Sequence, residues 1–156
     1  MQPIGFVETD AVGDEVREKS RLSRIVLRRD LQDALMGIED FSHLFVLFWL
    51  SEISSDHRKW LKVYPRGRRD LPLVGVFATR TKFRPNPIGL TLVKLIRVNG
   101  NVLVVRGLDA FDKTPILDIK PFDPWDTAAE AKVPVWWMKL QEERMAKRKE
   151  RKTNTD

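Results

Sequence analysis

The residues best suited to chemistry lie in the string TRTKFRPNPIG, residues 79–89. Pro85 and Pro87 each fix one backbone φ angle. They also push Arg84 and Asn86, the residues that precede them, toward extended conformations. The loop is therefore stiff before any ligand binds, and its guanidinium and amide groups can bind an anion or a nucleobase at little entropic cost. The alternative is a rigid turn between two strands whose arginines are merely exposed.

A second polar cluster occupies the string DAFDKTPILDIKP, residues 109–121. Asp118 and Lys120 are two positions apart, so on a strand they share one face while Ile119 points to the other. This spacing predicts an ion pair or a polar site. The alternative is an ordinary surface salt bridge, which contributes little to stability.

Basic charge is concentrated in the middle of the chain. The net charge is +6, from 28 Lys and Arg against 22 Asp and Glu, but residues 58–94 hold ten basic groups and one acidic group. A surface that binds phosphates needs a field of one sign, so this segment predicts polyanion binding. A solubilising basic face is the alternative. The expected phosphate contacts are Arg66, Arg68 and Arg69, in the turn-like string RGRRD, and Lys82.

Several classes of function are excluded by composition. The chain has no cysteine, which removes disulfides, thiolate catalysis and thiolate-bound metals, and its two histidines have no metal-site spacing. No G-x-G pair is present, so neither a dinucleotide fingerprint nor a P-loop can be drawn. The longest apolar run, residues 44–50, is too short to cross a bilayer, and no secretory signal is visible. We therefore expect a metal-free protein of the cytoplasm that does not bind membranes.

The elements that must position these residues are mostly strands. Asn99-Gly100-Asn101 separates two apolar runs and predicts a hairpin. Residues 44–50 are apolar on both faces, which suits a strand buried on both sides or a barrel strand at a dimer contact. Gly75 suggests a bulge or a close approach of another chain segment. The strands are expected at residues 4–7, 23–27, 44–50, 60–64, 73–79, 90–98 and 102–106.

Two helices complete the expected fold. A short helix is predicted over residues 31–36, with Asp30 as its N-cap and Gly37 as its stop. Another begins near residue 135 and runs to residue 149. The connections between strands are too short for a parallel α/β fold, so we predict a mainly β protein: a small single-sheet β-barrel with one short helix and a C-terminal helix. One domain is expected over residues 3–137, followed by a helical, basic and partly disordered tail over 138–156.

The motifs, in their order along the chain, resemble the TsaA-like family, also called TrmO. The resemblance covers residues 4–126 and rests on FSHLFVLFWL, GVFATRTKFRPNPIGLTLV and TPILDIKPF. It implies a β-barrel, dimeric, S-adenosylmethionine-dependent tRNA methyltransferase, in a short form without the further C-terminal domain of longer bacterial relatives. The implied target is N6 of the threonylcarbamoyl-modified adenosine on the 3′ side of the anticodon.

The resemblance also implies site residues. Its cofactor positions match Leu50, Ser51, Arg80, Leu90, Asp112, Lys113, Thr114 and Pro115. An arginine can pair with the methionyl carboxylate, and an apolar wall can exclude water from the transfer. Ser51 and Lys113 stand where the family often has His and Gly.

The acceptor nitrogen implied by the resemblance is a poor nucleophile, so we expect Asn86 or Asp118 to polarise its N–H. Arg84 is expected to hold an RNA phosphate or the threonyl carboxylate. Two other functions remain open: an RNA-binding barrel without catalysis, and a methyltransferase for a different substrate. Residues 44–50 and the pair Trp136-Trp137 are the candidates for covering apolar area in a dimer.

Overall fold

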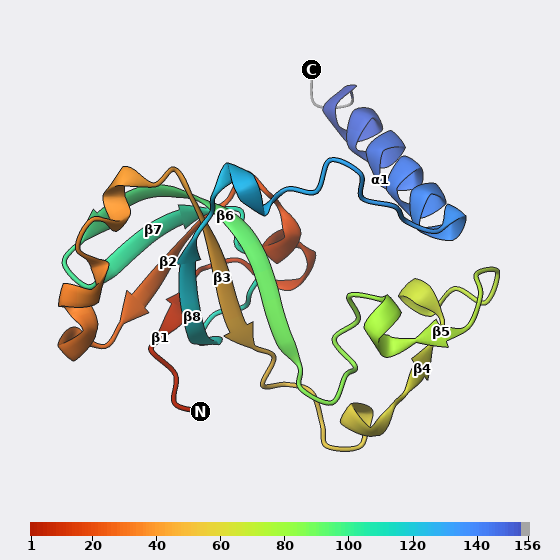
Figure 1. Cartoon of the computed structure of the whole chain (residues 1–156), viewed down its shortest axis with the longest axis horizontal. Helices are drawn as coiled ribbons and strands as arrows, with labels where there is room; N and C mark the ends of the chain where they lie inside the picture. The colour runs from red at the N-terminus through yellow and green to blue at the C-terminus, as the bar shows by residue number, and fades with distance from the viewer. Residues whose placement is uncertain (154–156) are drawn as a thin grey trace.

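The computed structural model describes residues 1–153, and six antiparallel strands of this part form a closed barrel (Figure 1). Neighbouring strands around the barrel follow the order β1-β2-β7-β6-β3-β8, and β1 pairs with β8 to close it. The predicted mainly β barrel is therefore confirmed. The strands are β1 (Gly5–Glu8), β2 (Leu22–Leu27), β3 (His43–Trp49), β6 (Ile88–Asn99), β7 (Val102–Arg106) and β8 (Pro115–Pro121).

Alternate side chains along each strand fill the barrel interior, as the two-residue period of a strand requires. In β3, Leu44 and Val46 are fully buried, whereas Phe45, Leu47 and Trp49 on the outer face are only half-buried. Of the two interpretations of this apolar run, the structure supports the barrel strand, not the strand buried on both faces. The innermost side chains include Val7, Ile25, Leu44, Val46, Val93, Leu103, Val105 and Ile116.

Two glycines are required where they stand. The hairpin between β6 and β7 turns at Gly100, which has a φ of 58°, and this confirms the hairpin predicted from the sequence. Gly89 in β6 lies under the ring of Phe48 on β3. A Cβ atom at Gly89 would lie 2.2 Å from Cε2 of that ring, so any larger residue would displace a side chain of the core.

Residues 51–87, which we call the lobe, leave the barrel between β3 and β6 (Figure 1). The lobe contains one antiparallel pair, β4 (Lys62–Val63) and β5 (Val74–Gly75), and three 3-10 helices at His57–Lys59, Pro65–Gly67 and Val76–Ala78. The strands predicted over 60–64 and 73–79 are thus much too long. Within residues 1–153, no third strand lies beside this pair to extend the ladder, and the chain turns into a 3-10 helix directly after Gly75.

The lobe was not distinguished from the barrel in the sequence, and the prediction of a bulge or close approach at Gly75 was wrong. A Cβ atom at Gly75 would have Leu61 O, at 3.9 Å, as its nearest neighbour from elsewhere in the chain. No bulge is present in this two-residue pairing, and no segment of the described chain approaches Gly75 closely.

The C-terminal helix α1 (Val135–Thr153) packs against the lobe (Figure 1). Leu140 is buried, and the half-buried rings of Trp136 and Trp137 lie 5.5 Å apart beside lobe residues. This helix was predicted and extends four residues further than expected, while residues 154–156 of the expected tail lie outside the described part of the chain. No helix within residues 1–153 is long and apolar enough to span a bilayer.

The short helix predicted over 31–36 is a 3-10 helix, Arg29–Leu35, and Asp30 does not cap it. Its carboxylate instead accepts two hydrogen bonds from the guanidinium of Arg28, at 3.1 and 2.7 Å. Gly37 follows the helix with a φ of 83°, in agreement with its predicted role as a stop. The remaining 3-10 helices of the described chain are Gly13–Arg17, Ile38–Asp40 and Pro124–Asp126.

Candidate active site and basic cavity

The two chemically suited segments, 79–89 and 109–121, flank the end of β3. Phe48 pairs with Gly89 on β6 and, on its other side, with Ile116 on β8. Just beyond the strand, the backbone N–H of Leu50 donates to the carbonyl of Pro87 at 2.9 Å. Because both neighbours of β3 run antiparallel to it, both begin where it ends. We call this place the site end of the barrel.

The turn from Asp112 to Pro115 is fastened to β1. The backbone N–H of Lys113 donates to Val7 O at 2.8 Å, and Val7 N–H donates to Thr114 O at 3.0 Å. Oδ1 of Asp112 accepts a hydrogen bond from the N–H of Thr9 at 3.1 Å. The backbone of the turn is thus held rigidly while the Asp112 and Lys113 side chains remain exposed.

Lys113 adopts a left-handed conformation, with a φ of 63°. A side chain in this region costs about 1 kcal/mol or more, whereas glycine adopts it freely. The turn therefore holds Lys113 in this conformation at some cost in stability.

Asp118 and Leu90 lie on the outer surface on either side of Leu47, which pairs with both. Adjacent strands are about 4.8 Å apart, so the backbones of Asp118 and Leu90 are separated by about 10 Å. Asp118 forms the predicted ion pair with Lys120, at 2.9 Å, and Ile119 packs against the core as predicted. A carboxylate and an exposed leucine therefore share one patch of the outer face.

Asn86 and Ser51 are exposed next to the hydrogen-bonded pair Leu50 and Pro87. Arg84 is half-buried, and its guanidinium carbon lies 5.9 Å from the ring centre of Phe77. Asn86 and Ser51 are thus at the site end, whereas Arg84 contacts the lobe residue Phe77. Arg80 is placed differently, because it lines a cavity that none of the other expected cofactor residues line.

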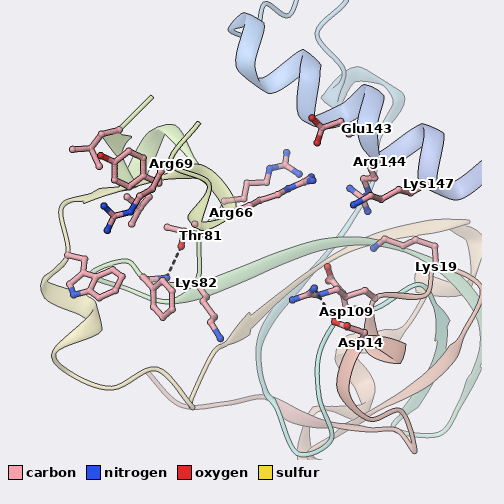
Figure 2. A pocket seen from close by; sticks show the side chains of 18 of the residues that line it. Asp14, Lys19, Arg66, Arg69, Thr81, Lys82, Asp109, Glu143, Arg144 and Lys147 are labelled. Carbon is pink, nitrogen blue, oxygen red and sulfur yellow. Dashed lines mark hydrogen bonds and ion pairs between the residues drawn. The ribbon is translucent and has the colours of Figure 1, made fainter. Parts of the chain in front are cut away.

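This cavity, of about 1870 Å³, lies between the lobe, α1 and the part of the barrel near residues 14–20 (Figure 2). Nine cations and four acids line it, so it attracts polyanions. Three of the nine were predicted from the sequence as phosphate contacts: Arg66, Arg69 and Lys82. The cations are Arg17, Lys19, Lys62, Arg66, Arg69, Arg80, Lys82, Arg144 and Lys147.

Arg68 is the exception among the expected phosphate contacts. Its guanidinium binds Asp70, at 2.6 Å, and Glu143 on α1. These hydrogen bonds hold the pKa of Asp70 down at about 2 and also lower the pKa of Glu143. Arg68 therefore fastens α1 to the lobe.

Some residues that line the cavity were not predicted from the sequence as site residues. Arg144 and Lys147 reach it from α1, and Lys19 reaches it from the barrel side (Figure 2). Trp60 and Phe83 also line it. The basic excess after residue 139 was a signal for the helix residues, but nothing local in the sequence indicated that α1 folds back over the lobe.

Comparison with known proteins identifies the family of this chain. A family model described as the N-terminal domain of tRNA-methyltransferase O matches residues 12–126. The chain belongs to this family. It is 48% identical over 128 residues to a probable S-adenosyl-L-methionine-binding protein of Methanothermobacter thermautotrophicus, covering 78% of this chain and 88% of that protein.

Some relatives are longer than this chain. A tRNA (adenine(37)-N6)-methyltransferase of Mus musculus is 38% identical over 131 residues, which cover 78% of this chain but 30% of the mouse protein. The crystal structure of TrmO from Pseudomonas aeruginosa has a TM-score of 0.68 and 29% identity, over 86% of this chain and 60% of that one. The barrel therefore corresponds to a portion of both proteins.

Proposed function

We propose that this chain is an S-adenosylmethionine-dependent methyltransferase that modifies N6 of an adenosine in tRNA, in the cytoplasm. The observation that carries the proposal is the convergence of segments 79–89 and 109–121 on the end of β3. These segments contain most of the expected site residues, and the basic cavity lies beside the lobe that one of them enters. The names of the archaeal and mouse relatives support the same chemistry.

The residues present fit the cofactor by the chemistry of their groups. Arg80 is exposed and forms no ion pair within the described residues, so its guanidinium is available to a carboxylate from the side of the basic cavity, which it lines apart from the other expected cofactor residues. The rigid turn containing Asp112 and Thr114 offers backbone groups to adenine and a carboxylate to ribose hydroxyls. Leu50 and Leu90 supply apolar surface. When bound, S-adenosylmethionine supplies an electrophilic methyl group.

The chain's own residues then orient the acceptor. Most of the rate comes from holding the adenine N6 in line with the donor methyl. Asp118 would accept the N6 proton as the bond from N6 to the methyl carbon forms and the bond from the donor sulfur to that carbon breaks, and the Asn86 amide would orient the base. Lys120 keeps the Asp118 side chain in place through their 2.9 Å contact.

We assign the threonylcarbamoyl-modified adenosine as the preferred target, because its carboxylate matches Arg84. The guanidinium of Arg84 is partly exposed and rests beside Phe77, which restricts its movement. A fixed guanidinium binds a carboxylate with less entropic loss than a mobile one. An unmodified adenosine has no such group and is expected to react more slowly.

The test is methyl transfer to tRNA, followed by mass spectrometry of the digested nucleosides, with and without the threonylcarbamoyl group. Arg80→Ala and Asn86→Ala are expected to reduce transfer at limiting cofactor, whereas Arg97→Ala, on the other half of β6, serves as the control. Unchanged transfer in both site variants would overturn the site assignment. Calorimetry with S-adenosylmethionine and S-adenosylhomocysteine distinguishes an enzyme from an RNA-binding barrel.

We also propose that two copies of the chain associate through the outer face of β3 and β6. Leu90, Leu92 and Ile96 are 60, 42 and 38% exposed, next to the half-buried outer side chains of β3. Exposed apolar side chains grouped on one face in this way are typical of a protein–protein contact. Light scattering of the wild type is expected to give a dimer and of Leu92→Glu a monomer; a monomeric wild type would refute the proposal.

A further inference from the structure

Three rings of the lobe form a cluster at the wall of the basic cavity. The ring centres of His57 and Trp60 are 4.9 Å apart, those of His57 and Phe83 are 4.8 Å apart, and those of Trp60 and Phe83 are 5.0 Å apart. Trp60 and Phe83 both line the cavity. Because the first two rings precede β4 and the third follows β5, the cluster also joins the two halves of the lobe.

This cluster is not closed over as a core would be. Trp60 remains 45% exposed, although an indole ring in a well-packed interior is largely covered. Its neighbour Phe83 is half-buried. The rings therefore support one another from behind and present apolar surface to the cavity, where a flat ligand can lie against them.

Cations surround this ring surface. Nζ of Lys82 lies 5.4 Å from the centre of the Phe83 ring, and Arg66, Arg69 and Arg80 line the same cavity. Arg66 holds a left-handed conformation with a φ of 54°, a backbone state that is costly for arginine and typical of functional sites. Arg144 also reaches the cavity, from α1 (Figure 2).

We propose that Trp60 and Phe83, supported by His57, form a stacking platform for one unpaired base of an RNA whose adjoining phosphates contact Lys82 and Arg66. Aromatic rings set among cations bind single-stranded nucleic acid in this way, because every base has a flat π face. The identification of the ligand as RNA rests on the proposed function. The platform is distinct from the site-end residues and holds a nucleotide other than the one that is methylated.

The experiment compares two RNA probes on the full chain: a hairpin with an unpaired loop and a fully paired duplex with the same number of phosphates. Trp60→Leu keeps apolar volume but removes the ring, and it is expected to weaken hairpin binding by about tenfold while leaving duplex binding unchanged. Trp60→Phe is expected to retain most of the hairpin affinity. Trp125→Leu is the matched control, because Trp125 is 91% exposed and does not line the cavity.

Hairpin binding by Trp60→Leu at wild-type affinity would refute the platform, as would an equal loss for both probes. Phe83→Leu is expected to reproduce the selective loss, and thermal unfolding monitored by circular dichroism shows whether each variant remains folded. If a Trp60 variant is unfolded, quenching of wild-type tryptophan fluorescence by the hairpin, absent with the duplex, tests the same contact. Its absence with the hairpin would also refute the proposal.

Methyl transfer separates this inference from the proposed function. If the wild type methylates tRNA and Trp60→Leu retains its hairpin affinity, the platform is wrong and the enzyme assignment stands. If the wild type methylates no tRNA but Trp60→Leu loses hairpin binding selectively, the platform stands and the enzyme assignment fails. When both are correct, Trp60→Leu raises KM for tRNA more than it lowers kcat.

Discussion

The barrel and the lobe are stabilised by different interactions. The barrel is a closed ladder of six strands around an apolar interior, whereas the lobe has one pair of two-residue strands, a few buried apolar side chains such as Leu71 and Val76, a ring cluster and ion pairs to α1. The lobe also lies within the basic segment 58–94 over most of its length. The comparison indicates a division of labour, in which the barrel supplies stability and the lobe supplies exposed groups for binding.

The largest contrast is expected from removing leucine side chains. Leu44 is fully buried in the barrel, so Leu44→Ala is expected to lower the free energy of unfolding by about 2–5 kcal/mol through lost burial and a cavity. Leu61 in the lobe is 70% exposed, and Leu61→Ala is expected to change the free energy of unfolding by less than about 0.5 kcal/mol. Urea denaturation measures both; equal losses would contradict the division of labour.

A pair of strand glycines sharpens the same contrast. Gly89→Ala brings a Cβ to 2.2 Å from the Phe48 ring and is expected to destabilise the barrel by about 1–3 kcal/mol. In the lobe, Gly75→Ala meets no atom from elsewhere in the chain closer than 3.9 Å and has an ordinary φ of −61°. Its thermal midpoint is expected to match or slightly exceed that of the wild type. A neutral Gly89→Ala would show that the core at Phe48 is loosely packed.

Cations of the lobe are expected to affect RNA affinity instead of stability. Arg66→Ala with Arg69→Ala removes two phosphate contacts, so the slope of log K against log salt is expected to fall by about 0.7 for each contact. Filter binding over a salt series measures this change. Arg97→Ala, on the barrel, is the control for lost charge, and an equal effect there would mean that the cavity is not the binding surface.

The smallest effect is expected from acid. Arg68 lowers the pKa of Asp70 from 3.8 to about 2, so the network it forms with Glu143 is fully present above the ordinary carboxyl pKa. Its contribution is lost as pH falls from about 4 toward 2, because protonation breaks the ion pairs. Amide hydrogen exchange in α1 should rise over this range in the wild type. In Arg68→Met, amide hydrogen exchange in α1 should not rise over this range, because the carboxyl groups of Asp70 and Glu143 no longer have a guanidinium partner.

Five of the six barrel strands were predictable from their apolar runs, and the hairpin between β6 and β7 was predictable from Asn99 and Gly100 at its turn. The sixth, β8, was not among the expected strands. The opposing sides of Asp118 and Ile119 were predictable from the two-residue period of a strand. The lengths of the strands in the lobe were not predictable, because β4 and β5 pair only with each other within the described residues and have no further strand to extend their ladder. Nor was the pairing of Arg68 with Glu143, which are 75 positions apart and meet only after α1 has packed.

The attachment of the lobe has a consequence for how such proteins can diversify. Its two ends leave the barrel side by side, joined by the hydrogen bond between Leu50 N–H and Pro87 O at 2.9 Å. An insertion with adjacent ends can be lengthened, shortened or exchanged without opening the sheet, because the entropy of closing a loop changes only slowly with its length. Exchanging the segment between β3 and β6 would thus change the groups that the lobe offers for binding while the barrel sheet stays intact.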